Sequence, residues 1–352
     1  MIKTSVYNLT VGMYVAKLDR NWLDTSFFRH SFLIKDQKLL ERLKTECDFV
    51  FIDPAKSVST TNIKQQNQID AINAAKLERN KAKKILVQFF DKIQRGDRID
   101  SHFLINFIGT FTNKILCETE SYLYLNMLEE KDNSLAEKSI RVFVFFLVFA
   151  KHIGVKKTQL LDIAIAAMLH DVGMLSAPKE LLNSAFISKN ERKYIENHTK
   201  IGVDILKKEN TFSELILNTI KHHHENIDGS GYPSGLKGRE ISLYSRMLNI
   251  TCMFEALTRN RVYRKAVSPI EAIKSLVHNI NTKLDHRLTL RFIEAMGLYP
   301  PGSIISLKND AQFKVLSYNP KTGYSVVENK LTNGTPAPLI IQAKDIEQLI
   351  SC

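Results

Sequence analysis

The pattern of apolar and polar positions divides the chain into a mixed start, a helical middle and a β-rich end. Near the N-terminus, the runs 13–16, 31–34 and 49–52 have the composition of strands. Between the last two runs, residues 37–47 carry apolar side chains at helical spacing. Residues 1–55 therefore predict a small α/β module.

Helical spacing dominates the middle of the chain. Residues 56–68 are polar and poor in large apolar side chains, which is typical of a linker, and residues 69–93 predict a basic helix. Further helices are predicted at 103–130, 136–152, 160–169, 189–208, 212–222, 243–258 and 269–279. We expect a linker and basic helix over 56–100 and an all-helical bundle over 101–300.

The pattern changes again at the C-terminal end. Short apolar runs at 304–307, 313–316, 324–328 and 339–342 have strand-like composition, so residues 301–352 predict a small β appendage. The expected fold class is mainly α, with small α/β and β parts at the two ends.

Composition limits the class of protein. The chain has 352 residues, of which 44% are hydrophobic, enough for two or three compact domains. We find no run approaching the ~18 apolar residues of a membrane span and no signal-peptide pattern, so we expect a cytoplasmic protein without a membrane segment. The four cysteines have no CxxC spacing, which predicts reduced thiols.

The net charge of +12 favours an anionic partner. Nucleotides, nucleic acid and acidic protein surfaces all fit this charge, and so does an ordinary solvated basic surface. The predicted basic helix carries Lys76, Arg79, Lys81, Lys83, Lys84 and Lys92. Because no recognition motif accompanies them, nucleic-acid binding is the weakest functional alternative. The same helix is long enough to support a homodimer.

Candidate chemistry gathers in the bundle, where five of the ten histidines lie between His170 and His224. A single histidine on an apolar helix is usually a hydrogen-bonded core residue. Imidazoles and a carboxylate from facing helices, however, suit iron, manganese or zinc. A carboxylate beside a histidine, as in His170-Asp171, can also bridge two metals that share a hydroxide. The cluster predicts a metal site that hydrolyses phosphate esters.

In order and spacing, these motifs resemble the HD-GYP domain. The matching residues are Leu169 to Gly173, His198, His223-His224-Glu225, Asp228 to Pro233, and Ala256 to Arg264. The run from Leu9 to Val15 is similar to the small domain that often precedes HD-GYP in one bacterial subgroup. The resemblance implies an HD-type helical bundle and a phosphodiesterase that opens cyclic-di-GMP, with two or three iron or manganese ions.

The resemblance also implies roles for individual residues. His170 and Asp171 would be metal ligands at the catalytic centre, with Asp171 bridging, and His198, His223 and His224 would complete the shell of one ion. Gly231, Tyr232 and Pro233 would shape the nucleotide pocket, and Arg261 and Arg264 would bind the substrate phosphates.

Four positions depart from the family pattern. Lys138 and Cys252 stand where a histidine and an aspartate normally bind metal, and Met174 stands where active members have a lysine. Ser134 stands at a ligand position of trimetal members. The first metal would keep only His170 and Asp171, whereas the second would still have Asp171, His198, His223 and His224. We therefore expect one metal ion rather than two, with iron or manganese before zinc, and no ion as the alternative. The ammonium of Lys138 could pair with Asp171 and repel the first metal.

The expected function is a degenerate HD-GYP protein of cyclic-di-GMP signalling, with weak or no hydrolysis. It would act by binding cyclic-di-GMP or a related nucleotide and by contacting protein partners of the pathway. One alternative is an active phosphodiesterase with an altered site in which Cys252 is an unusual ligand. The other is a basic nucleic-acid-binding protein.

Overall fold

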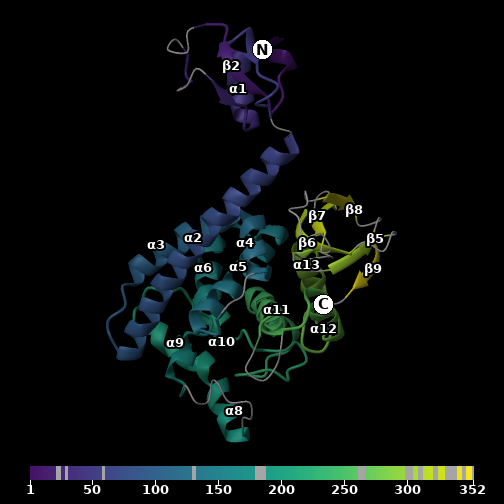
Figure 1. Cartoon of the computed structure of the whole chain (residues 1–352). Helices are drawn as coiled ribbons and strands as arrows, with labels where there is room; N and C mark the ends of the chain where they lie inside the picture. The colour runs from purple at the N-terminus through teal and green to yellow at the C-terminus, as the bar shows by residue number, and fades with distance from the viewer. Residues whose placement is uncertain are drawn as a thin grey trace. The chain divides into compact units, whose positions relative to one another are not determined.

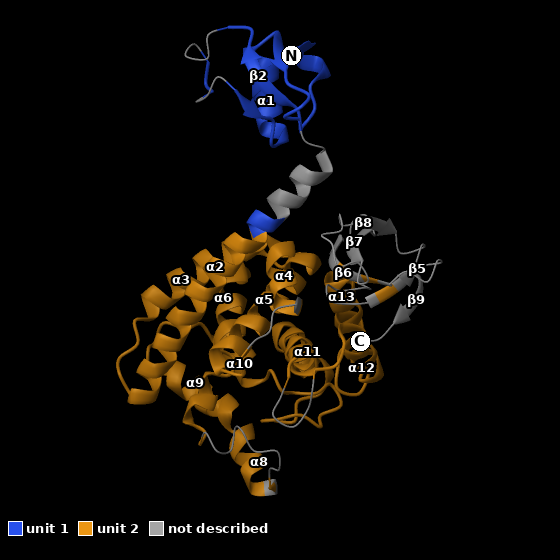
Figure 2. Cartoon of the chain, viewed as in Figure 1, with its two compact units in different colours: residues 1–71 blue, residues 72–352 orange. Residues whose placement is uncertain are grey.

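The chain forms two compact units, residues 1–71 and 72–352 (Figures 1 and 2). This computed structural model describes residues 1–20, 25–27, 31–57, 60–128, 132–178, 188–260 and 266–297. It also describes the strand residues 304–307, 312–319, 324–329, 339–342 and 346–350.

The first unit is a small antiparallel sheet with one α-helix. Its strands are β1 (Ile2–Ser5), β2 (Tyr14–Leu18), β3 (Phe32–Leu33) and β4 (Phe49–Ile52), in the order β1-β4-β2-β3, and a short 3-10 helix, η1 (Val6–Asn8), follows β1. Helix α1 (Gln37–Glu46) begins after Asp36, whose side chain accepts a hydrogen bond from the N–H of Leu39. Leu43 of this helix is buried with Val15 and Val50 of the sheet. The α/β character is confirmed, and β1 is an additional strand that its sequence did not reveal.

Helix α2 (Thr60–Arg95) is longer than the predicted basic helix. It begins inside the polar segment 56–68 that we expected to be a linker, and its first turns have no apolar periodicity by which the sequence could show them. Several of its basic side chains form ion pairs, among them Arg79 with Glu137, Lys81 with Glu78 at 2.9 Å, and Lys83 with Glu137 at 3.5 Å. These carboxylates neutralise charge that a nucleic acid would need.

The second unit is mainly a helical bundle, as predicted. After α2 its helices are α3 (Ser101–Cys117), α4 (Thr119–Leu128), α5 (Leu135–Ile153), α6 (Lys157–Leu169), η3 (Val172–Ser176), α8 (Lys189–Glu196), α9 (His198–Lys207), α10 (Glu214–Lys221), η4 (Gly238–Glu240), α11 (Leu243–Leu257), α12 (Pro269–His278) and α13 (His286–Met296). Helix α5 forms the centre, because it packs against α4, α6, α11 and α13 and every residue from Ser139 to Ala150 is buried. Figure 1 shows these helices around α5.

The C-terminal part of this unit contains an antiparallel sheet in the order β8-β7-β6-β5-β9. Its strands are β5 (Ile304–Leu307), β6 (Gln312–Asn319), β7 (Tyr324–Asn329), β8 (Leu339–Gln342) and β9 (Ile346–Ile350). The four predicted strands are confirmed, and β9 is an additional one.

Two helices predicted as continuous are interrupted. The first breaks at Glu118, where Lys151 Nζ donates to the Leu116 carbonyl at 2.7 Å and so satisfies a helix-terminal acceptor. The second breaks at Asn197, which ends α8 and places His198 at the first residue of α9. Neither break contains glycine or proline, so the apolar spacing predicted a continuous helix across each of them.

Helix α13 was not predicted, although its boundaries are marked in the sequence. The Asp285 side chain accepts a hydrogen bond from the N–H of Leu288, and Gly297 follows the last helical residue. Phe292 and Met296 lie one turn apart and are fully buried in the bundle.

One stretch of the described residues, Lys157–Ser176, is long and apolar enough to cross a membrane by length and composition. It comprises α6 and η3, and 61% of its apolar window is buried inside the protein. The core helix of a helical bundle passes the same test.

Candidate metal centre

The residues of the predicted site come from three places in the bundle. His170 and Asp171 follow α6, His198 begins α9, and His223 and His224 follow α10. The close approach of η3 to α9 depends on Gly173, because a Cβ there would lie 2.0 Å from the His198 carbonyl oxygen. A residue without a side chain is therefore needed two positions after Asp171 to bring it beside His198.

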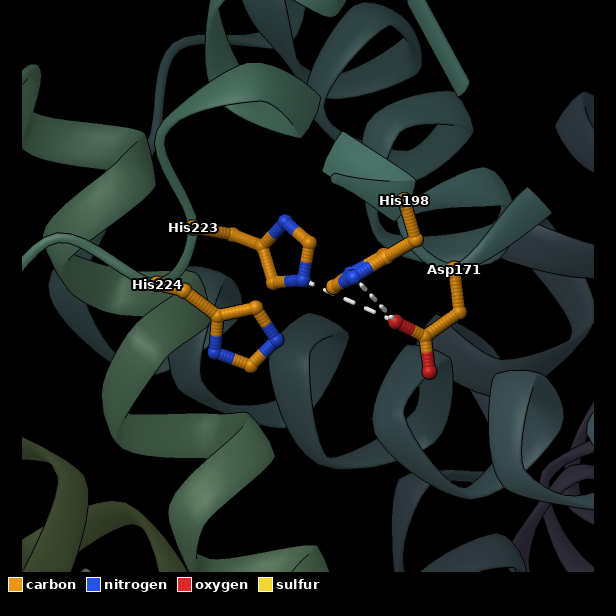
Figure 3. Close-up of side chains that lie close together, drawn as sticks. All are labelled: Asp171, His198, His223 and His224. Atoms are coloured by element: carbon orange, nitrogen blue, oxygen red, sulfur yellow. Dashed lines mark ion pairs between the residues drawn. The ribbon is translucent and has the colours of Figure 1, made fainter. Parts of the chain in front are cut away.

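The carboxylate of Asp171 lies among imidazoles (Figure 3). Its Oδ1 is 3.3 Å from Nε2 of His198 and 3.6 Å from Nε2 of His223, and its Oδ2 is 3.4 Å from Nε2 of His170. One ligand atom from each of Asp171, His198, His223 and His224 lies within 4.8 Å of the others. The structure thus brings together all five residues that the sequence predicted as metal ligands.

Backbone carbonyls orient three of these imidazoles. Nδ1 of His170 faces the Ala167 carbonyl at 2.9 Å, and Nδ1 of His198 and His223 faces the carbonyls of Ile195 and Ile220 at 2.7 and 2.6 Å. When Nδ1–H donates to a carbonyl, the Nε2 lone pair is left for a metal.

A group of buried polar atoms in this cage lacks partners. Within the part of the chain that the structure describes, Nε2 of His170, His198 and His223 and Oδ1 of Asp171 have no hydrogen-bond partner. Burying such atoms unpaired costs about 1–3 kcal/mol each. A bound cation would satisfy them together, so the donor set fits a divalent metal.

Charge in the metal-free cage is set by burial and by neighbouring ions. Burial lowers the pKa of His223 to about 4 and lowers that of His224 well below its ordinary value, so both imidazoles are neutral, as metal ligands must be. Burial acts against a charged His170, yet the neighbouring Asp171 raises the pKa of His170 to about 10. Burial would raise the pKa of Asp171, but His170 and Lys138 hold it well below its usual range.

Lys138 lies against the same carboxylate. Its ammonium forms an ion pair with Oδ2 of Asp171, which confirms the contact predicted from the sequence. Ser134 instead caps α5, because its hydroxyl accepts a hydrogen bond from the N–H of Glu137 at 3.2 Å. Met174 is partly buried in η3, where it offers only a thioether.

Cys252, which stands at a metal-ligand position of the family pattern, lies beside the cage. It is on α11 and is only 6% exposed. Its Sγ and one ring nitrogen from each of His170 and His223 lie within 4.8 Å of one another. One turn further along α11, Glu255 pairs with Arg141 of α5 at 3.1 Å, and this buried pair aligns the two helices.

The Gly231-Tyr232-Pro233 turn packs beside the metal cage. The ring of Tyr232 stacks on that of His224, with centroids 4.8 Å apart, and the N–H of Tyr232 donates to the His224 carbonyl. The predicted phosphate ligands Arg261 and Arg264 lie outside the described residues.

Two residues support this turn, although from the sequence we assigned neither of them a role. Glu225 is buried, and its carboxylate accepts hydrogen bonds from the N–H groups of Ser234 and Leu236. Asn249 donates to the Glu225 carbonyl. The sequence offered one signal for Asn249, because a residue three positions before Cys252 lies on the same face of α11.

We expect Gly231→Ala to destabilise this turn. The added Cβ would lie 2.3 Å from the Asn226 nitrogen and 2.5 Å from the Glu225 Cα, so backbone must shift. A loss of about 2 kcal/mol in the free energy of unfolding is expected, together with weaker metal binding, because His224 loses its support. Urea denaturation and calorimetric metal titration measure both. The matched control is Gly109→Ala, whose Cβ would meet only the Leu161 side chain at 3.4 Å, and equal effects of the two variants would contradict the expectation.

Comparison with known proteins identifies both parts of the chain. An HD domain model matches residues 123–288, and the domain of unknown function DUF3391 matches residues 1–102. A cyclic di-GMP phosphodiesterase of Pseudomonas aeruginosa is 27% identical over 86% of this chain and 78% of its own length. A cyclic di-GMP phosphodiesterase of Thermotoga maritima is 31% identical over 47% of each chain. By its HD domain and by these relatives, the chain is similar to proteins of the HD-GYP family.

Two further similar proteins are one named for a different nucleotide and one that resembles this chain in fold. A 3′3′-cGAMP-specific phosphodiesterase of Vibrio cholerae is 29% identical over 49% of this chain and 38% of its own length. An HDGYP protein of Bdellovibrio bacteriovorus has a similar structure, with a TM-score of 0.54 and 16% identity, and the match covers 83% of this chain and 97% of that one. The chain thus covers most of the Pseudomonas relative but less than half of the Thermotoga and Vibrio relatives.

Proposed function

We propose that this chain is a degenerate HD-GYP protein of cyclic-di-GMP signalling, which binds the nucleotide and hydrolyses it weakly or not at all. The proposal depends on one observation, the ion pair between Lys138 and Asp171. In an HD-GYP site the carboxylate of Asp171 would bridge two metal ions. Here a fixed positive charge already holds one of its oxygens and disfavours a cation on that side.

The remaining donors support one metal ion. Asp171, His198, His223 and His224 would hold iron or manganese, the first choice, and zinc is the alternative ion for the cage. When bound, such an ion supplies Lewis acidity to water, but a two-metal site also clamps the attacking and leaving oxygens. Lys138 can donate a hydrogen bond to a phosphate oxygen, yet it cannot generate a hydroxide, so weak turnover is expected.

The nucleotide is inferred from the relatives and from the turn beside the cage. The Pseudomonas, Thermotoga and Vibrio relatives are named as phosphodiesterases of cyclic di-GMP or 3′3′-cGAMP, both of them cyclic dinucleotides. We propose that Gly231, Tyr232 and Pro233 contact the nucleotide, and that Arg261 and Arg264 bind its phosphates. We also propose that the chain contacts signalling-protein partners, that it forms a homodimer, and that its domain boundaries lie near residues 55, 100 and 300.

Equilibrium binding and turnover measured on one preparation test the proposal. With manganese present, calorimetry is expected to show cyclic-di-GMP binding, while hydrolysis stays about 10²-fold or more below that of a two-metal HD-GYP enzyme assayed in parallel. Tyr232→Ala should weaken nucleotide binding, and Tyr194→Ala, on the exposed face of α8, should not. Turnover equal to that of the two-metal enzyme would overturn the proposal.

A further inference from the structure

We propose that the cage contains two overlapping metal positions that share His223, and that zinc takes the position formed by His170, His223 and Cys252. This inference rests on the metal-binding part of the proposed function. The inference adds a metal position in which the Cys252 thiolate is a ligand. The identity of the bound metal then determines which side chains coordinate it.

Two sets of ligand atoms meet in the cage. The first set is Asp171, His198, His223 and His224, and the second is His170, His223 and Cys252. All three members of the second set are buried. Among the described residues, Nε2 of His170 and Nε2 of His223 are also buried without a hydrogen-bond partner. These unpartnered atoms indicate that the second set, like the first, is built to receive a ligand.

His223 can serve only one position at a time. Its Nδ1 faces the Ile220 carbonyl, so Nε2 is the one nitrogen left for a metal, and its single lone pair binds one ion. The His223 ring is neighbour to both sets, with centroids 5.2 Å from that of His170 and 5.4 Å from that of His198. An ion on the Cys252 side therefore removes a ligand from the Asp171 side.

The two positions differ in the metals they favour. The second set pairs a thiol with two imidazoles, and thiolate selects zinc over manganese. Three protein ligands also leave the fourth tetrahedral position of zinc open. The first set offers a hard carboxylate oxygen, which suits manganese, but Lys138 already pairs with that carboxylate. Zinc binding displaces two protons to solvent, one from the Cys252 thiol and one from the His170 imidazolium, and manganese binding at the first set requires no such loss.

The full chain, stripped of metal with a chelator, allows a direct test with cobalt(II) as the spectroscopic substitute for zinc. We expect cobalt to give a near-ultraviolet thiolate-to-metal charge-transfer band, which zinc abolishes by displacement. Cys252→Ser should lose the band, whereas the matched control Cys117→Ser, at an exposed cysteine of α3, should keep it. Zinc should also protect Cys252 from alkylation, and manganese should not.

Ligand variants and competition separate the two positions. His198→Ala should keep the cobalt band and lose manganese binding. In the wild-type chain, zinc should displace manganese because both ions need His223, although their other ligands differ. A cobalt complex without a thiolate band, or zinc and manganese bound together, would overturn the inference while leaving the proposed function intact. If neither cobalt nor manganese binds the folded wild-type chain, the metal part of the proposed function fails as well.

Discussion

Changing Lys138 to histidine, Cys252 to aspartate and Met174 to lysine in one variant is expected to add a second metal ion and to raise cyclic-di-GMP hydrolysis by about 10²-fold or more. The histidine removes the ammonium from Asp171 and supplies an imidazole, and the aspartate supplies a carboxylate beside His170. Two ions can then stabilise both the attacking and the leaving oxygen, an electrostatic effect of at least this size. Metal analysis per chain and product chromatography measure the two gains.

The single variants provide the controls for this restoration. Lys138→His alone should admit more metal but remain slow, because Cys252 and Met174 are unchanged. Met174→Lys alone should leave the metal content as it is, since it adds no metal ligand. A triple variant that folds but gains neither metal nor turnover would show that these positions do not account for the loss.

Lys138→Met is expected to destabilise the metal-free protein by about 3 kcal/mol, the lower end of the cost of breaking a buried ion pair. Asp171 is 1% exposed, and without the ammonium its charge is compensated mainly by His170. Manganese should stabilise this variant more than the wild type, because the ion binds the folded state better once the competing cation is gone. Thermal unfolding with and without manganese measures both effects.

The matched control is Lys84→Met, at an exposed lysine of α2. This substitution should change the free energy of unfolding by no more than about 0.5 kcal/mol, and manganese should not alter that change. If Lys138→Met and Lys84→Met unfold alike in the absence of metal, the Lys138–Asp171 pair contributes nothing to stability, and the second part of the prediction loses its basis.

The metal cage could be predicted because its members lie in compact motifs. His170-Asp171 and His223-His224 are adjacent pairs. Lys138, at a position where the family has a metal-binding histidine, predicted an ion pair with Asp171. The family pattern placed Cys252 at a metal-ligand position, but spacing alone could not show that its Sγ lies near ring nitrogens of both His170 and His223. That proximity depends on how α11 packs against α10, and no local pattern records that packing.

The bundle shows the same division between local and tertiary causes. Apolar spacing revealed most helices, but the break at Glu118 depends on Lys151, a residue from another helix that hydrogen-bonds to the end of α3. The break at Asn197 has no punctuating glycine or proline. Helix α13 was different, because Asp285 and Gly297 marked its ends and could have been recognised.

The most direct test of the central claim is a crystal structure of the chain with manganese, with the metal located by anomalous scattering. We expect a single manganese peak between Asp171, His198, His223 and His224, with the Lys138 ammonium still on Oδ2 of Asp171. Two peaks bridged by Asp171, with Lys138 displaced from the carboxylate, would contradict it.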